Sequence, residues 1–155
     1  MFREIKRKEK TMGQEGTNQI LNEGLYGTLA SIGENGYPYS TPLNYVYENG
    51  EIYFHSAHNG NKVENIKLNN KVSFSVVSYH KILPDKFDTE YDSAVLYGKA
   101  YQIMEDTKKK KALMLLIKKY SKNFTNQGLE YISKAIDKVS VFRIEIEHMT
   151  GKKGR

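Results

Sequence analysis

The first half of the chain alternates apolar and polar positions with a period of two. Segments 25–32, 37–47 and 51–56 show this alternation, and Glu34-Asn35-Gly36 and Glu48-Asn49-Gly50 separate them. Asparagine and glycine tolerate the positive φ angles of tight hairpin turns. The pattern therefore predicts three consecutive antiparallel strands.

Two prolines interrupt the alternation in the second of these segments. Pro38 and Pro42 share one face of the expected strand with Ser40 and Asn44. Proline has no N–H to donate to a sheet, so it is confined to edges and irregular positions. The prolines therefore predict a strand whose backbone groups stay available to something else, such as a ligand.

A helical period begins after residue 60. Val63 and Ile66 fall on one face of an expected short helix over 61–68. The polar segment 79–92, which contains Pro84, is expected to be a loop. The other expected elements are strands over 71–78, 93–103 and 138–147, a helix over 106–120 capped by Asp106, and a helix that begins near residue 126.

This element order predicts a fold that is mainly β with α (α+β). Six strands, one inserted short helix and a helical pair suit an antiparallel barrel with helices on its outside better than a doubly wound parallel sheet. A chain of 155 residues that is 39% hydrophobic can bury a core as a single domain, 1–155, without disulfides or metal sites. The charged start of the chain makes residues 1–13 an expected flexible arm.

Composition excludes several classes of site. The chain has no cysteine, so disulfides, thiolate zinc sites, iron–sulfur clusters and cysteine nucleophiles are absent. The charged N-terminus is followed by no apolar segment, and no window approaches the roughly 20 apolar residues of a membrane span. We therefore expect a soluble cytoplasmic protein with no membrane partner.

The net charge of +6 raises the possibility of nucleic-acid binding. The excess of positive charge lies in residues 1–10, in the lysine-rich segment 108–122 and in the tail 152–155. A lysine run on a helix is usually a solvated face. A basic nucleic-acid-binding domain therefore remains only as a third interpretation.

The segment between the third strand and the short helix has the features of a phosphate site. A helix N-terminus offers unpaired N–H groups and a positive dipole end, and Gly60 lets the backbone approach an anion. Lys62 lies in the first helical turn, where the dipole disfavours a cation unless an anion is bound, and Ser56 could donate a further hydrogen bond. A plain turn with a solvent-facing lysine is the alternative.

The four histidines do not form a recognisable metal motif. His55 and His58 are three residues apart, and no third ligand lies at ligand spacing, so no metal site is expected. His55 is the one candidate for a catalytic base. No Ser–His–Asp arrangement, paired-carboxylate motif or glycine-rich nucleotide-binding loop can be found in the sequence.

Several segments together resemble the pyridoxamine 5′-phosphate oxidase-like flavoproteins, in particular the branch related to 5-nitroimidazole resistance proteins. The resemblance lies in residues 27–39, in Pro42-Leu-Asn-Tyr-Val-Tyr47, in Ile52-Tyr-Phe-His-Ser-Ala57 with the glycine and lysine that follow, and in the ending 144–152. It implies a split β-barrel that binds FMN and forms a homodimer, with one flavin in each of two clefts between the subunits.

The resemblance also implies roles for individual residues. The flavin phosphate would be held by the end of the third strand and the start of the helix, and the flavin ring would lie on backbone groups of the preceding strand. A further polar contact, five residues before Gly98, would be Ser93. The implied cofactor-binding residues are Ser40, Thr41, Pro42, Leu43, His55, Ser56, Ala57, Asn61, Lys62 and Ser93.

One departure from the family pattern bears on the reaction. Asn61 stands where pyridoxamine phosphate oxidases have an arginine, and no arginine lies between Arg7 and Arg143. Oxidation of pyridoxamine phosphate is therefore not expected. The resemblance favours an FMN-dependent reductase of small electron-poor aromatics such as nitro compounds, with NAD(P)H as a candidate electron donor. The alternative is a flavin- or haem-binding protein without turnover.

Overall fold

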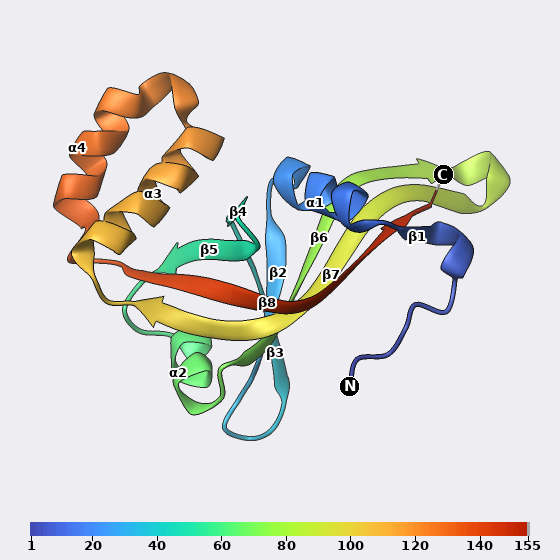
Figure 1. Ribbon diagram of the computed structural model, residues 1–155, viewed down its shortest axis with the longest axis horizontal. Helices are drawn as coiled ribbons and strands as arrows, with labels where there is room; N and C mark the ends of the chain where they lie inside the picture. Colours follow the sequence, from blue (N-terminus) through green and yellow to red (C-terminus); the bar gives the residue numbers. More distant parts are fainter. Residues whose placement is uncertain (155) are drawn as a thin grey trace.

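The computed structural model describes residues 1–154, in which eight strands form one curled antiparallel sheet (Figure 1). The strand order is β3-β2-β6-β7-β8-β5-β4, and β1 pairs with β8 outside this path. The strands are β1 Thr11–Met12, β2 Gly27–Ile32, β3 Pro38–Leu43, β4 Val46–Glu48, β5 Glu51–Ser56, β6 Lys71–Leu83, β7 Asp88–Ile103 and β8 Ser140–Lys153. The expected antiparallel barrel is confirmed, with eight strands in place of six.

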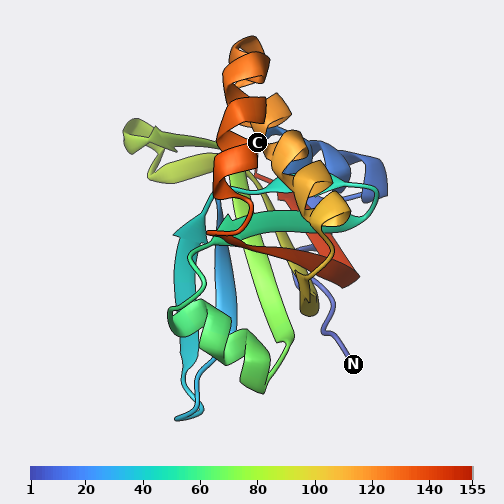
Figure 2. The ribbon, with the colours of Figure 1, turned by 90° about the vertical axis from the view of Figure 1, so that its left-hand side faces the viewer.

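Four α-helices surround this sheet: α1 Gln14–Glu23, α2 Asn61–Leu68, α3 Asp106–Tyr120 and α4 Thr125–Ala135. Helices α3 and α4 pack together beside β5, and α2 lies on the opposite side of the molecule against β2 and β3 (Figures 1 and 2). The expected helices over 61–68 and 106–120 are confirmed. Helix α1 was not expected from the sequence, and Asp106 is the first residue of α3 instead of its cap. Short 3-10 turns are η1 Lys8–Lys10, η2 Pro84–Lys86 and η3 Lys122–Phe124.

The barrel interior is filled by alternate residues of the central strands. The rings of Phe54 on β5 and Phe142 on β8 stack with centroids 5.2 Å apart, and Tyr45 meets Phe74 edge to face at 5.0 Å. A second apolar cluster lies under α3 and α4, where Ile132 is almost completely buried. The period-two pattern of β5 and β6 thus correctly marked the faces that are buried.

The second expected strand, 37–47, is broken into β3 and β4. Residues Asn44 and Tyr45 cross from β3, at one end of the sheet, to β4, at the other end. Tyr45 is fully buried, and its hydroxyl donates a hydrogen bond to the carbonyl oxygen of Leu21 at 2.5 Å. The apolar alternation continues through the break because the buried tyrosine occupies the next inward position, so the sequence pattern did not reveal it.

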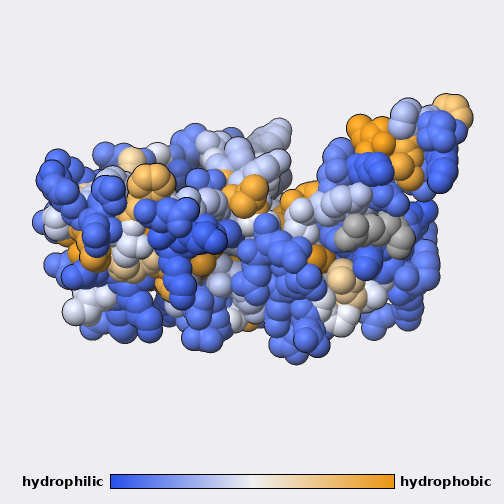
Figure 3. All heavy atoms as spheres, turned by 90° about the horizontal axis from the view of Figure 1, so that it is seen from above, coloured by the Kyte–Doolittle hydropathy of each residue, from blue (hydrophilic) through white to orange (hydrophobic). Residues whose placement is uncertain are grey.

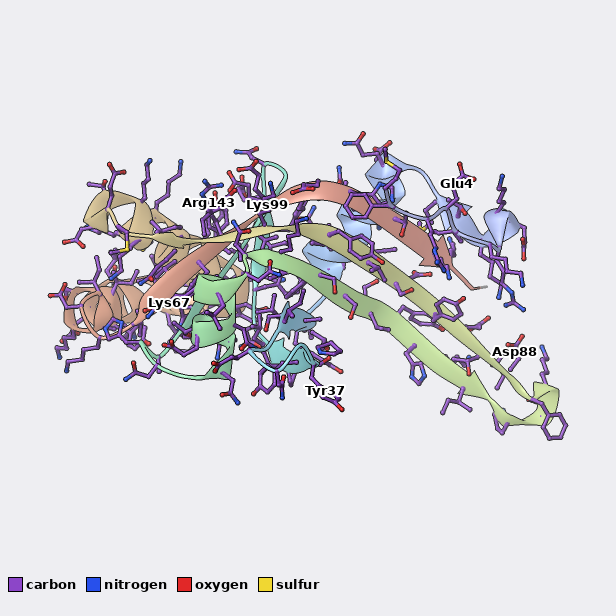
Figure 4. The ribbon with its side chains drawn as sticks, turned by 90° about the horizontal axis from the view of Figure 1, so that it is seen from below. Glu4, Tyr37, Lys67, Asp88, Lys99 and Arg143 are labelled. Atoms are coloured by element: carbon purple, nitrogen blue, oxygen red, sulfur yellow. The ribbon has the colours of Figure 1, made fainter. Side chains whose placement is uncertain are left out.

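The expected loop over 79–92 is wrong, because these residues form a hairpin. Strand β6 continues to Leu83, η2 makes the turn, and β7 starts at Asp88. Phe87 makes the reversal with φ 50°. Figure 4 shows this arm extending from the body, with Asp88 near its end. Both faces of the arm are largely in water, so it lacks the alternation that marks a half-buried strand.

The N-terminal residues lie along the C-terminal half of β8. Thr11 and Met12 pair with Lys152 and Gly151. The ring of Phe2 stacks on those of Tyr97 and His148, at 4.9 and 5.0 Å between centroids. The flexibility expected of residues 1–13 concerns motion and stays a prediction.

The lysine-rich segment of α3 lies at the surface. Lys108, Lys110 and Lys111 are exposed, and Lys109 donates a hydrogen bond to the carbonyl oxygen of Ile136 at 2.5 Å. Figure 3 shows a largely hydrophilic face with scattered apolar patches. No helix within residues 1–154 combines the length and the apolar character needed to cross a membrane.

Candidate functional site

The junction between β5 and α2 has the backbone of an anion site. Gly60 is the N-cap of α2 with φ 137° and ψ 168°, a conformation that strongly favours glycine. No side chain of the described residues caps the helix, so its first N–H groups have no side-chain acceptor there. An added Cβ at Gly60 would meet nothing within 4 Å, which leaves open space beside these donors. The junction can therefore receive an anion.

The side chains expected at the phosphate site differ in how accessible they are. Asn61 and Ala57 are exposed, Lys62 is half-buried, and Lys62 makes no ion pair within the described chain. Ser56 is buried, and its hydroxyl donates to the carbonyl oxygen of Ala57 at 2.7 Å. The structure thus groups these residues at one junction, and the role of each toward a phosphate stays a prediction.

His55 lies on the outward face of β5, opposite the barrel core. It lines a small cavity of about 170 Å³ together with Asn44, Tyr120 and Tyr131, and leucine and isoleucine side chains of α3 form the apolar wall. Desolvation by the surrounding atoms, and next the positive charge of Lys62, lower the pKa of His55. The imidazole is therefore neutral at pH 7 and able to accept a proton.

His58 holds the turn that precedes α2. Its Nε2 donates to the carbonyl oxygen of Asp137 at 2.9 Å, which leaves Nδ1 to accept from the hydroxyl of Ser140 at 2.8 Å. Gln102 donates to the same hydroxyl at 3.3 Å. Both imidazole nitrogens of His58 are thus occupied by hydrogen bonds within the protein. Across residues 1–154, no three His, Asp or Glu side chains are grouped closely enough to hold a metal ion.

Strand β3 ends the sheet, as its prolines predicted. It pairs with β2 along one edge, with Ser40 opposite Ala30 and Thr41 opposite Leu29. Within residues 1–154 no strand lies beside the other edge, and Ser40 and Pro42 are exposed. Backbone groups on that edge are available to a ligand, and this is where the flavin ring was expected to lie.

The structure brings the β2–β3 hairpin and α2 to opposite walls of one cavity of about 600 Å³. Asn61, Glu64 and Asn65 line it from α2, and Tyr37 and Tyr39 line it from the hairpin. Of these residues, only Asn61 is among the cofactor-binding residues expected from the sequence. Two nearby tyrosines just before and within a proline-marked strand were the available signal, because exposed aromatic rings suit stacking on planar ligands.

Asn65 fixes the spacing of these two walls. It is buried, and its Nδ2 donates to the hydroxyl of Ser31 on β2 at 3.1 Å. A buried side-chain hydrogen bond of this kind ties α2 to the sheet. The start of the helix is therefore held at a defined position relative to the hairpin.

Ser93 is the one expected site residue that lies elsewhere. It is paired with Val77 on β6 and Lys152 on β8, near the base of the arm. Ile103, ten residues further along β7, is the residue whose partner on β8 pairs with His55. At about 3.3 Å per residue, Ser93 is about 30 Å along the strand from that point. Within one chain, Ser93 cannot join the β5–α2 junction.

The sequence profile described as pyridoxamine 5′-phosphate oxidase matches residues 14–153. The chain belongs to this family. The resemblance seen in the sequence is thereby confirmed. A comparison with curated proteins found no match.

Solved structures of the same fold agree with the family assignment. A candidate 5-nitroimidazole antibiotic resistance protein from Bacteroides thetaiotaomicron is 24% identical with a TM-score of 0.75, over 92% of this chain and 86% of its own. A conserved hypothetical protein from Mycobacterium tuberculosis is 20% identical with a TM-score of 0.82, over 98% and 91%. The FAD and haem binding protein from Mycobacterium smegmatis is 17% identical with a TM-score of 0.81, over 94% and 74%. At these identities the likeness establishes the fold.

Proposed function

We propose that this member of the pyridoxamine 5′-phosphate oxidase family binds FMN and reduces small electron-poor aromatic compounds in the cytoplasm. The observation that carries the proposal is the β5–α2 junction. There the start of α2 has no side-chain cap, a Cβ added at Gly60 (φ 137°) would meet nothing within 4 Å, and Lys62 makes no ion pair within residues 1–154. Helix N–H groups and a lysine favour a terminal phosphate dianion.

FMN is the preferred flavin because its phosphate is terminal. A terminal phosphate can take hydrogen bonds from several helix N–H groups and from Lys62 at once, whereas the diphosphate of FAD would have to leave room for an adenosine. Comparative titration with FMN and FAD tests this choice. Tighter binding of FAD would overturn FMN as the ligand, while the proposal that the protein binds a flavin would stand.

The chain's own residues would divide the work of binding and orientation. Bound flavin supplies hydride transfer. Lys62 and the start of α2 would anchor the phosphate, and the exposed edge of β3 would orient the ring through backbone groups. His55, neutral at pH 7, could accept a proton and return it, since it lies between Lys62 and the small cavity under α3.

We also propose a homodimer with the flavin between the subunits. The family resemblance implies that Ser93 touches the flavin, and Ser93 is remote from the junction within one chain. A second copy could bring its own Ser93 to the site. Light scattering that reports a stable single subunit with bound flavin would contradict this arrangement.

A visible spectrum of the purified protein after addition of excess FMN and removal of free ligand tests the main proposal. We expect retained flavin absorbance that NAD(P)H bleaches under anaerobic conditions and that a nitroaromatic acceptor restores. Retained colour without bleaching would favour a flavin carrier without turnover. Absence of any flavin uptake would overturn the proposal, and salt-sensitive DNA binding in its place would support the basic-domain interpretation.

A binding protein without turnover is the second candidate. The observation in its favour is the structural likeness to the FAD and haem binding protein from Mycobacterium smegmatis. Haem titration monitored at the Soret band distinguishes a haem-binding protein from the proposed reductase. Pyridoxamine 5′-phosphate should not be oxidised in either case, because Asn61 replaces the expected arginine beside Lys62.

A further inference from the structure

The two ends of the split barrel are joined by a crossing of only two residues. Strand β3 ends at Leu43 and β4 begins at Val46, so Asn44 and Tyr45 make the whole connection. Because β3 and β4 are the two ends of the sheet, this crossing sets where the free edge of β3 lies relative to β5. A shift of the crossing would move that edge directly.

The last two residues of α3 hold the backbone of this crossing. The Tyr120 hydroxyl accepts a hydrogen bond from the Tyr45 N–H at 3.1 Å, and it lies 2.9 Å from the Tyr45 carbonyl oxygen and 2.7 Å from that of Leu25. The Lys119 ammonium donates to the same Tyr45 carbonyl at 3.0 Å. Both polar backbone groups of Tyr45 are thus bound by α3.

The Lys119 side chain has a second contact with the same residue. Its Nζ lies 3.8 Å from the centroid of the Tyr45 ring, within the range of a cation–π interaction. No carboxylate pairs with Lys119 anywhere in residues 1–154. A half-buried lysine without an acidic partner is costly to keep, and here its contacts are with the crossing.

The side chain of Tyr45 is fixed from the other direction. It is fully buried, its hydroxyl donates to Leu21 of α1, and its ring meets Phe74 in the core. The crossing is therefore held on the inside by α1 and the core and on the outside by α3. Small movements of α3 relative to the barrel would be passed to Tyr45 through the side chains of Lys119 and Tyr120.

The geometry points to Lys119 and Tyr120 as positioning residues of the flavin site. They hold the crossing so that the free edge of β3, from Thr41 to Leu43, lies in the position that binds the flavin ring. This inference rests on the proposed function. The same crossing also supplies Asn44 to the cavity that His55 and Tyr120 line. By holding the crossing, α3 therefore also sets the distance between the free edge of β3 and the imidazole of His55.

Ring-end and phosphate-end effects can be separated with riboflavin, which lacks the phosphate. The test measures dissociation constants for FMN and riboflavin in Lys119→Met and Tyr120→Phe, followed by flavin fluorescence. Each variant should weaken both ligands by the same factor, on the order of five- to tenfold for a lost hydrogen bond. Lys62→Ala should weaken FMN alone.

Two controls separate positioning from general destabilisation. Lys118→Met changes the exposed neighbouring lysine on α3 and should leave both constants within about twofold of the wild type. Ile132→Val removes a buried methyl group under α4, lowers the melting temperature and should leave flavin binding unchanged. Lys119→Arg keeps the charge and the donor and should recover most of the affinity.

Each alternative outcome has a distinct meaning. Unchanged binding in both variants, or a lower melting temperature without weaker binding, would overturn the positioning role. A loss confined to FMN would place the effect at the phosphate and also overturn it. If the wild type itself binds neither flavin, the proposed function fails together with this inference, whereas wild-type binding with unaffected variants removes this inference alone.

Discussion

His58 of the β5–α2 turn and Ser140, the first residue of β8, are joined by a hydrogen bond of 2.8 Å between Nδ1 and the hydroxyl oxygen. The contact connects positions 82 residues apart in the sequence and closes the turn against the start of β8. Ser140 is almost completely buried. A histidine that could be taken for a ligand or a base is therefore a structural residue.

Replacing His58 with alanine should destabilise the protein by about 1–3 kcal/mol, because the buried Ser140 hydroxyl loses its acceptor. Urea denaturation followed by circular dichroism measures the change. His80→Ala, at an exposed position in the arm, is the control and should have little effect. Equal midpoints for the two variants would show that the contact contributes nothing to stability.

Replacing Lys62 with alanine should weaken FMN binding by about 1.5–3 kcal/mol, the usual size of a hydrogen bond to a charged group. Fluorescence quenching of added FMN gives the dissociation constant. Lys67→Ala is the matched control, since Lys67 lies at the exposed end of the same helix and pairs with Glu64 at 3.5 Å. An unchanged constant in Lys62→Ala would remove the phosphate assignment.

The pKa of His55 should lie below 6.5, since desolvation and then the charge of Lys62 both disfavour the imidazolium. An NMR titration of the imidazole signals measures it, and Lys62→Gln should raise it. The sign for stability follows: the folded state binds the proton less readily than the unfolded state, so stability is lost as pH falls below 6.5. A midpoint at or above 6.5 would contradict the assigned surroundings.

Burial lowers the pKa of Lys119 from 10.5 to about 8, because a half-buried ammonium loses part of its hydration. Between these values the unfolded chain binds more protons than the folded one, so Lys119 makes stability rise with pH. The difference in unfolding free energy between wild type and Lys119→Met should therefore change in favour of the wild type from pH 8 to 10. Urea titrations at several pH values measure this difference. If the unfolding free energies of the two proteins changed with pH in parallel, the lowered pKa of Lys119 would be contradicted.

The elements that sequence reasoning placed correctly each have one buried face. Strand β5 over 51–56 and helix α3 over 106–120 match their expected bounds. Their apolar residues recur at the period of the element, because only one side meets the core. The junction between β5 and α2 was found in the same way, since a local turn, a glycine and a lysine lie next to one another in the sequence.

The elements that could not be predicted from the sequence depend on contacts between distant segments. Helix α1 buries only Thr17, Ile20 and Leu21, so its apolar stripe is too short to predict a helix. The arm of β6 and β7 forms through backbone pairing, with water on both faces, and the pairing continues to Leu83 opposite Asp88. Neither feature leaves a hydrophobic period in the chain.

The sequence by itself determined the family, the order of most elements and the residues around Gly60, because those depend on local backbone preferences and on which side chains avoid water. Only the tertiary structure decided that two residues join the ends of the barrel and that Lys119 and Tyr120 hold that crossing. It also decided that Ser93, on β7 near the base of the arm, lies far from Lys62 on α2. The reason is physical: strand pairing and helix packing set these distances, and neither is encoded in the spacing of residues along the chain.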